Sequence, residues 1–170
     1  LPEGYSTDVS NPKVWQHRGQ WYMVLGARDG NDRGCVLLYD AAELGEWVSR
    51  VVLAGSRCGG LRDAGYLWES PDFFRIGNEW VLLCCPRGIP REPTRFLNTA
   101  SCAYLVGQFD YESKTFRHKP QMYEADAGFE FYAPQTTLAP DGRRIMVALM
   151  GVPGGEEMQQ PTVKNGWLHQ

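Results

Sequence analysis

Three of the X-Pro steps along the chain each open a short extended segment, a tight turn and a longer apolar segment. The three copies are NPKVWQHRGQWYMVLGA from Asn11, SPDFFRIGNEWVLLCCP from Ser70 and APQTTLAPDGRRIMVALM from Ala133. Their prolines lie about 60 residues apart, and glycine-containing pairs at 18–19, 77–78 and 141–142 supply hairpin turns. A repeat of this length, with a hairpin in every copy, constrains the chain to a series of similar β units.

The composition between these landmarks is that of an all-β chain. There are 19 glycines, 11 prolines, six tryptophans, eight tyrosines and seven phenylalanines. The apolar runs are short, rich in valine, leucine and aromatic side chains, and bounded by turn residues, as strands are. One segment, 41–47 (AAELGEW), has a helical pattern, but it is too short to change the class. We therefore predict an all-β fold built from antiparallel sheets.

Four strands can be assigned to each of the first two copies. CVLLYD and AYLVGQFD supply third strands that end in an aromatic residue and Asp, and WVSRVVLAG and TFRHKPQMY supply fourth strands. Four-stranded units repeated around an axis are the blades of a β-propeller. We predict that residues 1–170 form a partial propeller domain of about two full blades and part of a third, with repeats starting near residues 11, 70 and 133. The alternative is a β-sandwich whose hairpins resemble one another by coincidence.

The charge balance and the apolar runs exclude several classes of partner. The 17 basic and 20 acidic side chains give a formal net charge of −3. Because nucleic-acid phosphates require a basic face, we expect no nucleic-acid partner. No apolar run approaches the roughly 20 residues that span a bilayer, and the first ten residues lack the basic flank and apolar stretch of a signal peptide. We therefore expect a cytoplasmic chain without a membrane partner.

The cysteines and histidines show no spacing typical of metal ligands. The five cysteines contain no CxxC pair, and the three histidines lie far apart. We therefore predict no metal site, and buried free thiols are the simpler interpretation of the cysteines. Cys84 and Cys85 are neighbours in one apolar strand, so their side chains should point to opposite faces.

The starts of the innermost strands are where a propeller should place its chemistry. These strands line the central channel, and in this chain they begin at the X-Pro steps. Asn11, Glu69 and Tyr132 are therefore expected at one mouth of the channel. Glu69 is the candidate for chemistry, because a carboxyl group beside an aromatic wall such as Trp68 is suited to act as a general acid. The alternative is an ordinary strand-end glutamate exposed to water.

Several motifs then point to a family. LWESPDFF resembles the WECPDFF signature of glycoside hydrolase family 32, the β-fructosidases that include invertases, levanases and sucrose-6-phosphate hydrolases. VSNPKVW falls where this family has FRDPKVW, and FEFYAPQT with GRRIMVALMG resembles its DFYAPQT and GRRI…GWMG. The similarity covers essentially the whole chain, in order and with matching spacing.

The resemblance implies both an architecture and a reaction. It implies a five-bladed propeller with a funnel-shaped sugar site and a retaining mechanism that uses two carboxylates. Glu69 matches the family's general acid/base, and the implied partner is a fructose-containing carbohydrate such as sucrose, sucrose 6-phosphate or a fructan. No metal ion or organic cofactor is implied. The predicted substrate-binding residues are Ser10, Asn11, Trp68, Tyr132 and Gln135.

Two features of the family are missing from this sequence. The chain contains no NDPNG motif, which carries the family's nucleophilic Asp. The RDP step reads Ser10-Asn11-Pro12, so its Arg and its Asp are both replaced. Asn11 can hydrogen-bond a hydroxyl group, but it carries no charge. We therefore expect that the 170-residue chain alone does not hydrolyse sugars.

Three interpretations stay open. The first is a portion of a family 32-like glycosidase, and the second, favoured by Ser10 and Asn11, is a degenerate carbohydrate-binding propeller without activity. The third is a β module for assembly that contacts no sugar. Because an open arc of blades exposes sheet edges, we expect self-association or the rest of a longer chain to cover them. We favour the longer chain, since Gln170 falls inside a family strand. The arginine-rich segment 87–95 (RGIPREPTR) is a candidate phosphate site, against the simpler interpretation of a solvated loop.

Overall fold

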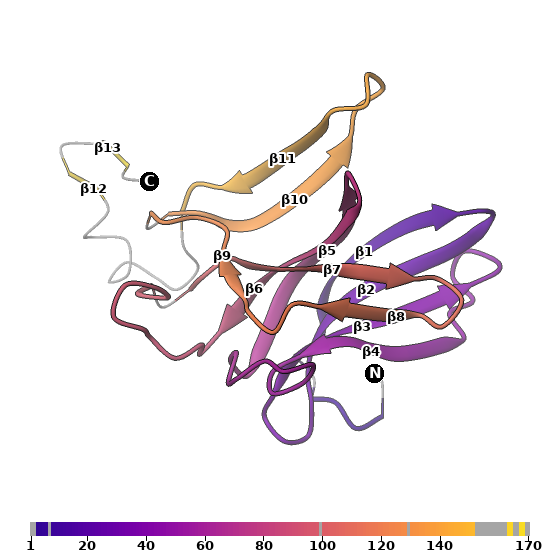
Figure 1. The fold of residues 1–170 in the computed structure, drawn as a ribbon, viewed down its shortest axis with the longest axis horizontal. Helices are drawn as coiled ribbons and strands as arrows, with labels where there is room; N and C mark the ends of the chain where they lie inside the picture. The colour runs from indigo at the N-terminus through magenta and orange to yellow at the C-terminus, as the bar shows by residue number, and fades with distance from the viewer. Residues whose placement is uncertain are drawn as a thin grey trace.

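The computed structural model describes residues 3–6, 8–98, 100–128 and 130–151, and the backbone of 163–164 and 167–168. These residues form a succession of antiparallel β-sheets (Figure 1), which confirms the predicted all-β class. The segment 41–47 is the end of a strand followed by a turn, not a helix. In the described part of the chain, no helix is long and apolar enough to cross a membrane.

Each sheet is built from strands that follow one another in the chain. The first sheet has the order β1 (Ser10–His17), β2 (Gln20–Arg28), β3 (Gly34–Ala41) and β4 (Ser49–Gly55). The second has the order β5 (Leu67–Ile76), β6 (Glu79–Arg87), β7 (Ala103–Asp110) and β8 (Thr115–His118), and β9 (Tyr123–Glu124) also pairs with β7. The remaining strands form the pairs β10 (Tyr132–Leu138) with β11 (Arg144–Leu149), and β12 (Val163–Lys164) with β13 (Trp167–Leu168). In Figure 1 the first two sheets lie side by side, and β2 packs on β5.

The strands β1, β5 and β10 share one irregularity of the backbone. Each has a register shift at its X-Pro step, where the pairing with the next strand moves by one residue. The residue before each proline has a positive φ, which is 54° at Asn11, 49° at Ser70 and 49° at Ala133. This left-handed conformation is costly for a residue with a Cβ atom, and bulges often redirect a side chain next to a functional site. The repeated X-Pro step therefore encodes a bulge as well as a strand start.

The main hydrophobic core lies between the first and second sheets. Trp68 on β5 is fully buried there, together with Val24, Val36 and Leu82. Its indole N–H donates a hydrogen bond to the main-chain oxygen of Ala64 at 2.8 Å, so the buried polar group is satisfied. This core therefore sets the relative orientation of the first and second sheets.

Two glycines of the first sheet allow the close approach of Trp68. A Cβ atom on Gly26 of β2 would lie 2.0 Å from the main-chain oxygen of Trp68, and one on Gly34 of β3 would lie 2.4 Å from its indole ring. The oxygen belongs to the backbone of a paired strand, so it cannot turn aside. A glycine in a strand often marks such a contact between two backbones.

A buried polar network ties the three bulged strands together. Lys13 Nζ on β1 donates to the main-chain oxygen of Thr136 on β10 at 2.7 Å and lies 3.5 Å from Asp72 Oδ1. Asp72 Oδ2 on β5 accepts hydrogen bonds from the Thr136 N–H at 2.6 Å and from its hydroxyl group at 2.7 Å. Gln135 donates to the main-chain oxygen of Ser70 at 3.2 Å and accepts from Lys13 at 3.4 Å. The residues that directly follow the three prolines therefore hold β1, β5 and β10 in a fixed relation.

The cysteines are distributed over both faces of the second sheet and beyond it. Cys84 lies in the main core, whereas Cys85 packs in a smaller cluster with Cys102 and Tyr132, so the predicted opposite orientation is confirmed. All five cysteines are free thiols. Cys58 is exposed, so the expectation that the cysteines are buried is wrong for this one.

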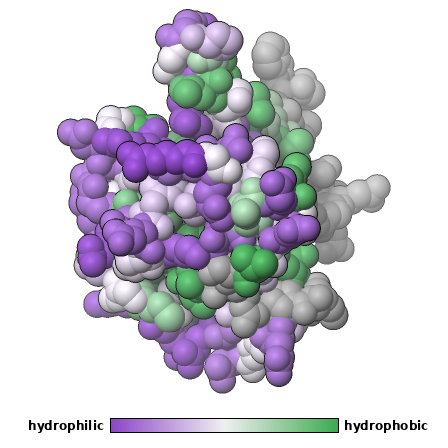
Figure 2. All heavy atoms as spheres, turned by 90° about the vertical axis from the view of Figure 1, so that its right-hand side faces the viewer, coloured by the Kyte–Doolittle hydropathy of each residue, from purple (hydrophilic) through white to green (hydrophobic). Residues whose placement is uncertain are grey.

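The hairpin of β10 and β11 exposes apolar side chains. Ile145, Met146, Val147 and Leu149 on β11 are 41%, 46%, 67% and 63% exposed. In Figure 2 a hydrophobic area lies just below the hydrophilic tip of the projection at the top of the molecule. Exposed apolar side chains that lie together are typical of interaction surfaces.

Candidate active site

A cavity of about 450 Å³ opens at the starts of β1, β5 and β10. Further walls come from the end of β6 and from the end of β11 with the residues after it. The lining residues are Asn11, Glu69, Ser70, Arg87, Tyr132, Ala133, Leu149, Met150 and Gly151. The residues that precede the three prolines therefore meet at one cavity.

Glu69 lies on the wall of this cavity with one carboxylate oxygen held by two donors. Its Oε2 accepts a hydrogen bond from the Tyr132 hydroxyl group at 2.5 Å and another from Arg87 Nε at 2.5 Å. The Glu69 side chain is 24% exposed and that of Arg87 is 23% exposed, so water competes weakly for the ion pair. Both donors stabilise the ionised carboxylate. Glu69 is thus held in a defined orientation, unlike a solvated strand-end glutamate.

Arg87 and Tyr132 also contact each other. The guanidinium carbon of Arg87 lies 5.2 Å from the centre of the Tyr132 ring, within the range of a cation–π contact. Burial raises the pKa of Tyr132 well above that of a free tyrosine, and its hydrogen bond to Glu69 adds to this shift. The phenol therefore stays protonated and acts as a donor to the carboxylate.

The bulge in β5 decides which side chains surround Glu69. If the register of the rest of the β5–β6 hairpin continued past the bulge, Glu69 would face Pro86. The bulge moves the pairing by one residue, so Glu69 faces Cys85 instead. Side chains two residues apart on a strand share a face, which puts Arg87 on the same side as Glu69 and Tyr132.

The predicted substrate-binding residues lie in different surroundings. Asn11 and Tyr132 line the cavity together with Glu69. Gln135 is not among the cavity-lining residues, because its amide group joins β10 to β1 and β5. The side chain of Ser10 lies outside the described residues.

The position of Trp68 contradicts the predicted contact with substrate. The side chain is 0% exposed and belongs to the main core, not to the cavity. Adjacent side chains on a strand point to opposite faces, so Glu69 faces the cavity while Trp68 faces the first sheet. The aromatic group that does flank Glu69 is Tyr132.

Arg87 is the site residue that sequence reasoning missed. In the sequence it is the first residue of the arginine-rich segment 87–95, which suggested a loop rather than a strand end. It is the last residue of β6, and its side chain contacts Glu69. The signal that would have found it is the hairpin register, because Arg87 shares a face with Glu69 only after the one-residue shift.

The cavity can supply a proton donor or acceptor from Glu69. Among the described residues that line it, no second carboxylate is present. A retaining glycosidase needs a nucleophilic carboxylate roughly 5–5.5 Å from the acid/base. In the part of the chain that the structure describes, no group of three or more His, Cys, Asp or Glu side chains is arranged to hold a metal ion.

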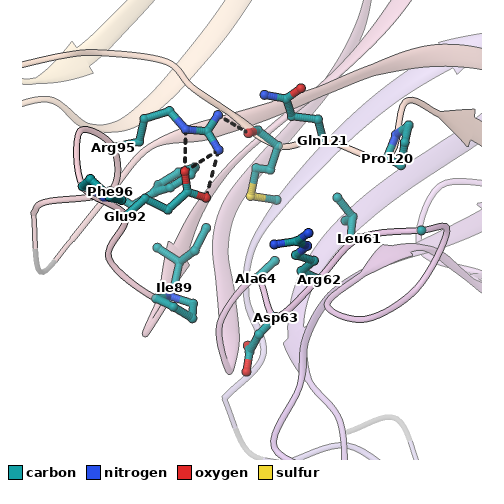
Figure 3. Close-up of a pocket in the computed structure, with 14 residues that line it drawn as sticks. Leu61, Arg62, Asp63, Ala64, Ile89, Glu92, Arg95, Phe96, Pro120 and Gln121 are labelled. Atoms are coloured by element: carbon teal, nitrogen blue, oxygen red, sulfur yellow. Dashed lines mark hydrogen bonds and ion pairs between the residues drawn. The ribbon is translucent and has the colours of Figure 1, made fainter.

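A second cavity, of about 760 Å³, lies between residues 60–64, the arginine-rich segment and residues 120–122 (Figure 3). On its wall, Arg95 binds both carboxylate oxygens of Glu92 at 2.9 Å and donates to the main-chain oxygen of Met122 at 3.5 Å. Arg87 is paired with Glu69 on the first cavity. Two of the three arginines of the segment are therefore already engaged, which favours the structural interpretation over a phosphate site.

The whole chain, residues 1–170, matches the family model of the glycosyl hydrolases family 32 N-terminal domain. This chain belongs to glycosyl hydrolase family 32. It is 55% identical to a sucrose-6-phosphate hydrolase of Salmonella typhimurium, with 100% of this chain and 36% of that protein covered. It is 41% identical to a sucrose-6-phosphate hydrolase of Bacillus subtilis (strain 168), with 99% of this chain and 35% of that protein covered. The chain thus spans about a third of the length of these curated relatives.

A solved family 32 structure has the same fold. A variant of a Bombyx mori family 32 β-fructofuranosidase in complex with sucrose superimposes with a TM-score of 0.82 and 30% sequence identity. The alignment covers 99% of this chain and 34% of that one. The predicted family and the predicted class of antiparallel propeller blades are therefore confirmed, while the number of blades stays a prediction. In this family 32 chain, the LWESPDFF motif places Glu69 on the wall of the cavity.

Proposed function

We propose that residues 1–170 form part of the catalytic propeller of a β-fructofuranosidase, in which Glu69 is the general acid/base. The observation that carries this proposal is the carboxylate of Glu69, held at Oε2 by Tyr132 and Arg87 on the wall of a cavity. A carboxyl group fixed in this way can donate a proton in one step and accept one in the next. Membership of family 32 supports hydrolysis of a glycosidic bond as the reaction.

The proposed reaction has two steps. Protonated Glu69 donates its proton to the glycosidic oxygen while a nucleophilic carboxylate attacks the anomeric carbon, and the bond to the leaving sugar breaks. Ionised Glu69 then takes a proton from the water that cleaves the fructosyl–enzyme bond, and both carboxyl groups return to their starting state. The nucleophile would come from another polypeptide segment that completes the cavity.

The proposed substrate is a fructose-containing carbohydrate, with sucrose and sucrose 6-phosphate as the first candidates. The relatives from Salmonella typhimurium and Bacillus subtilis are sucrose-6-phosphate hydrolases. The Bombyx mori structure holds sucrose. The first measurement is therefore a comparison of the hydrolysis rates of sucrose and sucrose 6-phosphate.

A second candidate function is carbohydrate binding without catalysis. Asn11 lines the cavity at the position where the family motif has an aspartate. A neutral amide binds a sugar hydroxyl group without the charge assistance that a carboxylate provides. In this alternative, the cavity binds a sugar and Glu69 is one of its hydrogen-bonding groups.

The test is a chimera in which residues 1–170 replace the aligned third of the Salmonella relative. We expect the chimera to release fructose from sucrose 6-phosphate, and the 170-residue chain alone to release none. Glu69→Gln in the chimera should lower kcat by about 10²- to 10⁴-fold, the usual contribution of general acid–base catalysis. The matched control is Glu112→Gln, which makes the same change at an exposed turn.

Two results would contradict the proposal. Full activity of the Glu69→Gln chimera would exclude Glu69 as the acid/base. A chimera that is folded by near-ultraviolet circular dichroism and binds sucrose, but has no turnover, would support the second candidate function instead.

A further inference from the structure

Arg87 supplies a guanidinium group to the cavity, whereas the RDP-like step of this chain supplies none. The RDP-like step of this chain has Ser10 in place of the arginine, and the cation beside Glu69 comes from the end of β6 instead. We propose that Arg87 is a positioning residue for Glu69, which holds Oε2 so that Oε1 is the oxygen that exchanges a proton with the substrate. This inference rests on the proposed function and deepens it.

The contacts of Arg87 fix the carboxylate from one side. Arg87 Nε and the Tyr132 hydroxyl group both bind the same oxygen, Oε2, at 2.5 Å. The guanidinium group also contacts the second donor, because its carbon lies 5.2 Å from the centre of the Tyr132 ring. An orientation set by two donors that also contact each other leaves the carboxylate little freedom to rotate, and such positioning is worth a large factor in rate.

Arg87 also provides the charge that acts on Glu69. Among the described residues, the titratable groups that face Glu69 are Arg87 and Cys85 on β6 and the Tyr132 hydroxyl group on β10, while Asn11 on β1 is neutral. An adjacent cation favours the ionised carboxylate, which is the form that activates water in the second step.

The experiment measures kcat and KM of chimeras that carry Arg87→Gln or Arg87→Lys. We expect Arg87→Gln to lower kcat by about 10- to 100-fold, with KM changed less than about twofold. Arg87→Lys keeps the charge but not the planar donor, so its kcat should fall between that of the parent and that of Arg87→Gln. The matched control is Arg91→Gln, an exposed arginine of the same segment, which should behave as the parent.

A double-mutant cycle with Glu69→Gln shows whether Arg87 acts through Glu69. In the Glu69→Gln background, Arg87→Gln should change kcat by less than about twofold, because the group that it positions is gone. An equal loss in both backgrounds would overturn the proposal, since Arg87 would then act independently of Glu69. The proposal would also be overturned if the Arg87 variants raised KM for sucrose 6-phosphate but not for sucrose, with kcat unchanged. Arg87 would then bind the phosphate group of the substrate.

The same data separate a failure of this inference from a failure of the proposed function. If the parent chimera is inactive, or if Glu69→Gln leaves it fully active, the proposed function fails and the role of Arg87 fails with it. If Glu69→Gln abolishes turnover while both Arg87 variants keep the parent's kcat and KM, the proposed function stands and the ion pair of Arg87 with Glu69 is only structural. Melting temperatures of all variants exclude unfolding as the cause of any loss.

Discussion

The strands β1 and β5 begin in the same way and present different chemistry. Both have a bulge at an X-Pro step, and both place a residue with positive φ before the proline. On β5 the bulge presents Glu69 to Arg87 and Tyr132, whereas the matching residues on β1 are the uncharged Ser10 and Asn11. The repeated backbone feature therefore builds the cavity, and the side chains that break the repeat determine its chemistry.

The residues opposite the two bulges differ for a packing reason. Ser10 is paired with Gly26, and Glu69 is paired with Cys85. A Cβ atom on Gly26 would collide with the backbone of Trp68, because the second sheet packs directly there. Cys85 has room for a side chain, which fills a small cluster beneath Tyr132. Gly26 thus lets the first sheet pack closely against the second, whereas Cys85 packs against Tyr132 on the wall of the cavity.

The largest expected effect follows from breaking the network that joins the two strand starts. Asp72→Ala should lower the free energy of unfolding by about 3 kcal/mol, because Lys13 and both donors of Thr136 lose a buried acceptor. Urea unfolding followed by tryptophan fluorescence measures this change. Glu112→Ala, at an exposed turn, should stay within about 0.5 kcal/mol of the parent. A loss for Asp72→Ala as small as that of the control would show that the network does not hold the strands together.

An intermediate effect on the free energy of unfolding is expected at Gly26, the residue that pairs with Ser10 at the bulge of β1. Gly26→Ala should lower the free energy of unfolding by about 1–3 kcal/mol, because the added methyl group overpacks the contact with Trp68. The control is Gly30→Ala, whose new Cβ atom would lie 3.6 Å from the main-chain oxygen of Gly4, an ordinary contact. If both variants unfold at the same urea concentration, the two sheets do not approach as closely as the structure places them.

The smallest effect concerns the charge that β1 lacks. In the chimera, Asn11→Asp should lower KM for sucrose by about fivefold, because charge-assisted hydrogen bonds to a sugar are roughly twice as strong as neutral ones. In the 170-residue chain alone the same substitution should create no turnover, since it supplies no nucleophile within reach of Glu69. Steady-state kinetics on both proteins test this. A KM that stays the same or rises would show that Asn11 does not contact the fructosyl group.

The sequence was informative where the causes of structure are local. Turn-forming pairs and short β-rich segments predicted the hairpins, and strand alternation predicted that Cys84 and Cys85 point apart. The breaks in the repeat directed attention to Glu69 and Tyr132, which the structure brings into contact. The predicted contact of Trp68 with substrate is wrong, because strand alternation puts Trp68 and its neighbour Glu69 on opposite faces of β5.

The sequence by itself determined the strands, the turns and the positions of the three strand starts, because proline, glycine and alternating apolar residues act on the few residues around them. The tertiary structure decided which side chains meet at Glu69. A one-residue bulge exchanges the two faces of a strand, so Arg87 reaches Glu69 only because β5 shifts its register between Glu69 and Asp72. The contacts that accompany this bulge, from Asp72 to Lys13 on β1 and to Thr136 on β10, join segments that are distant in the sequence. No local pattern records them, because they form only when the three strands pack together.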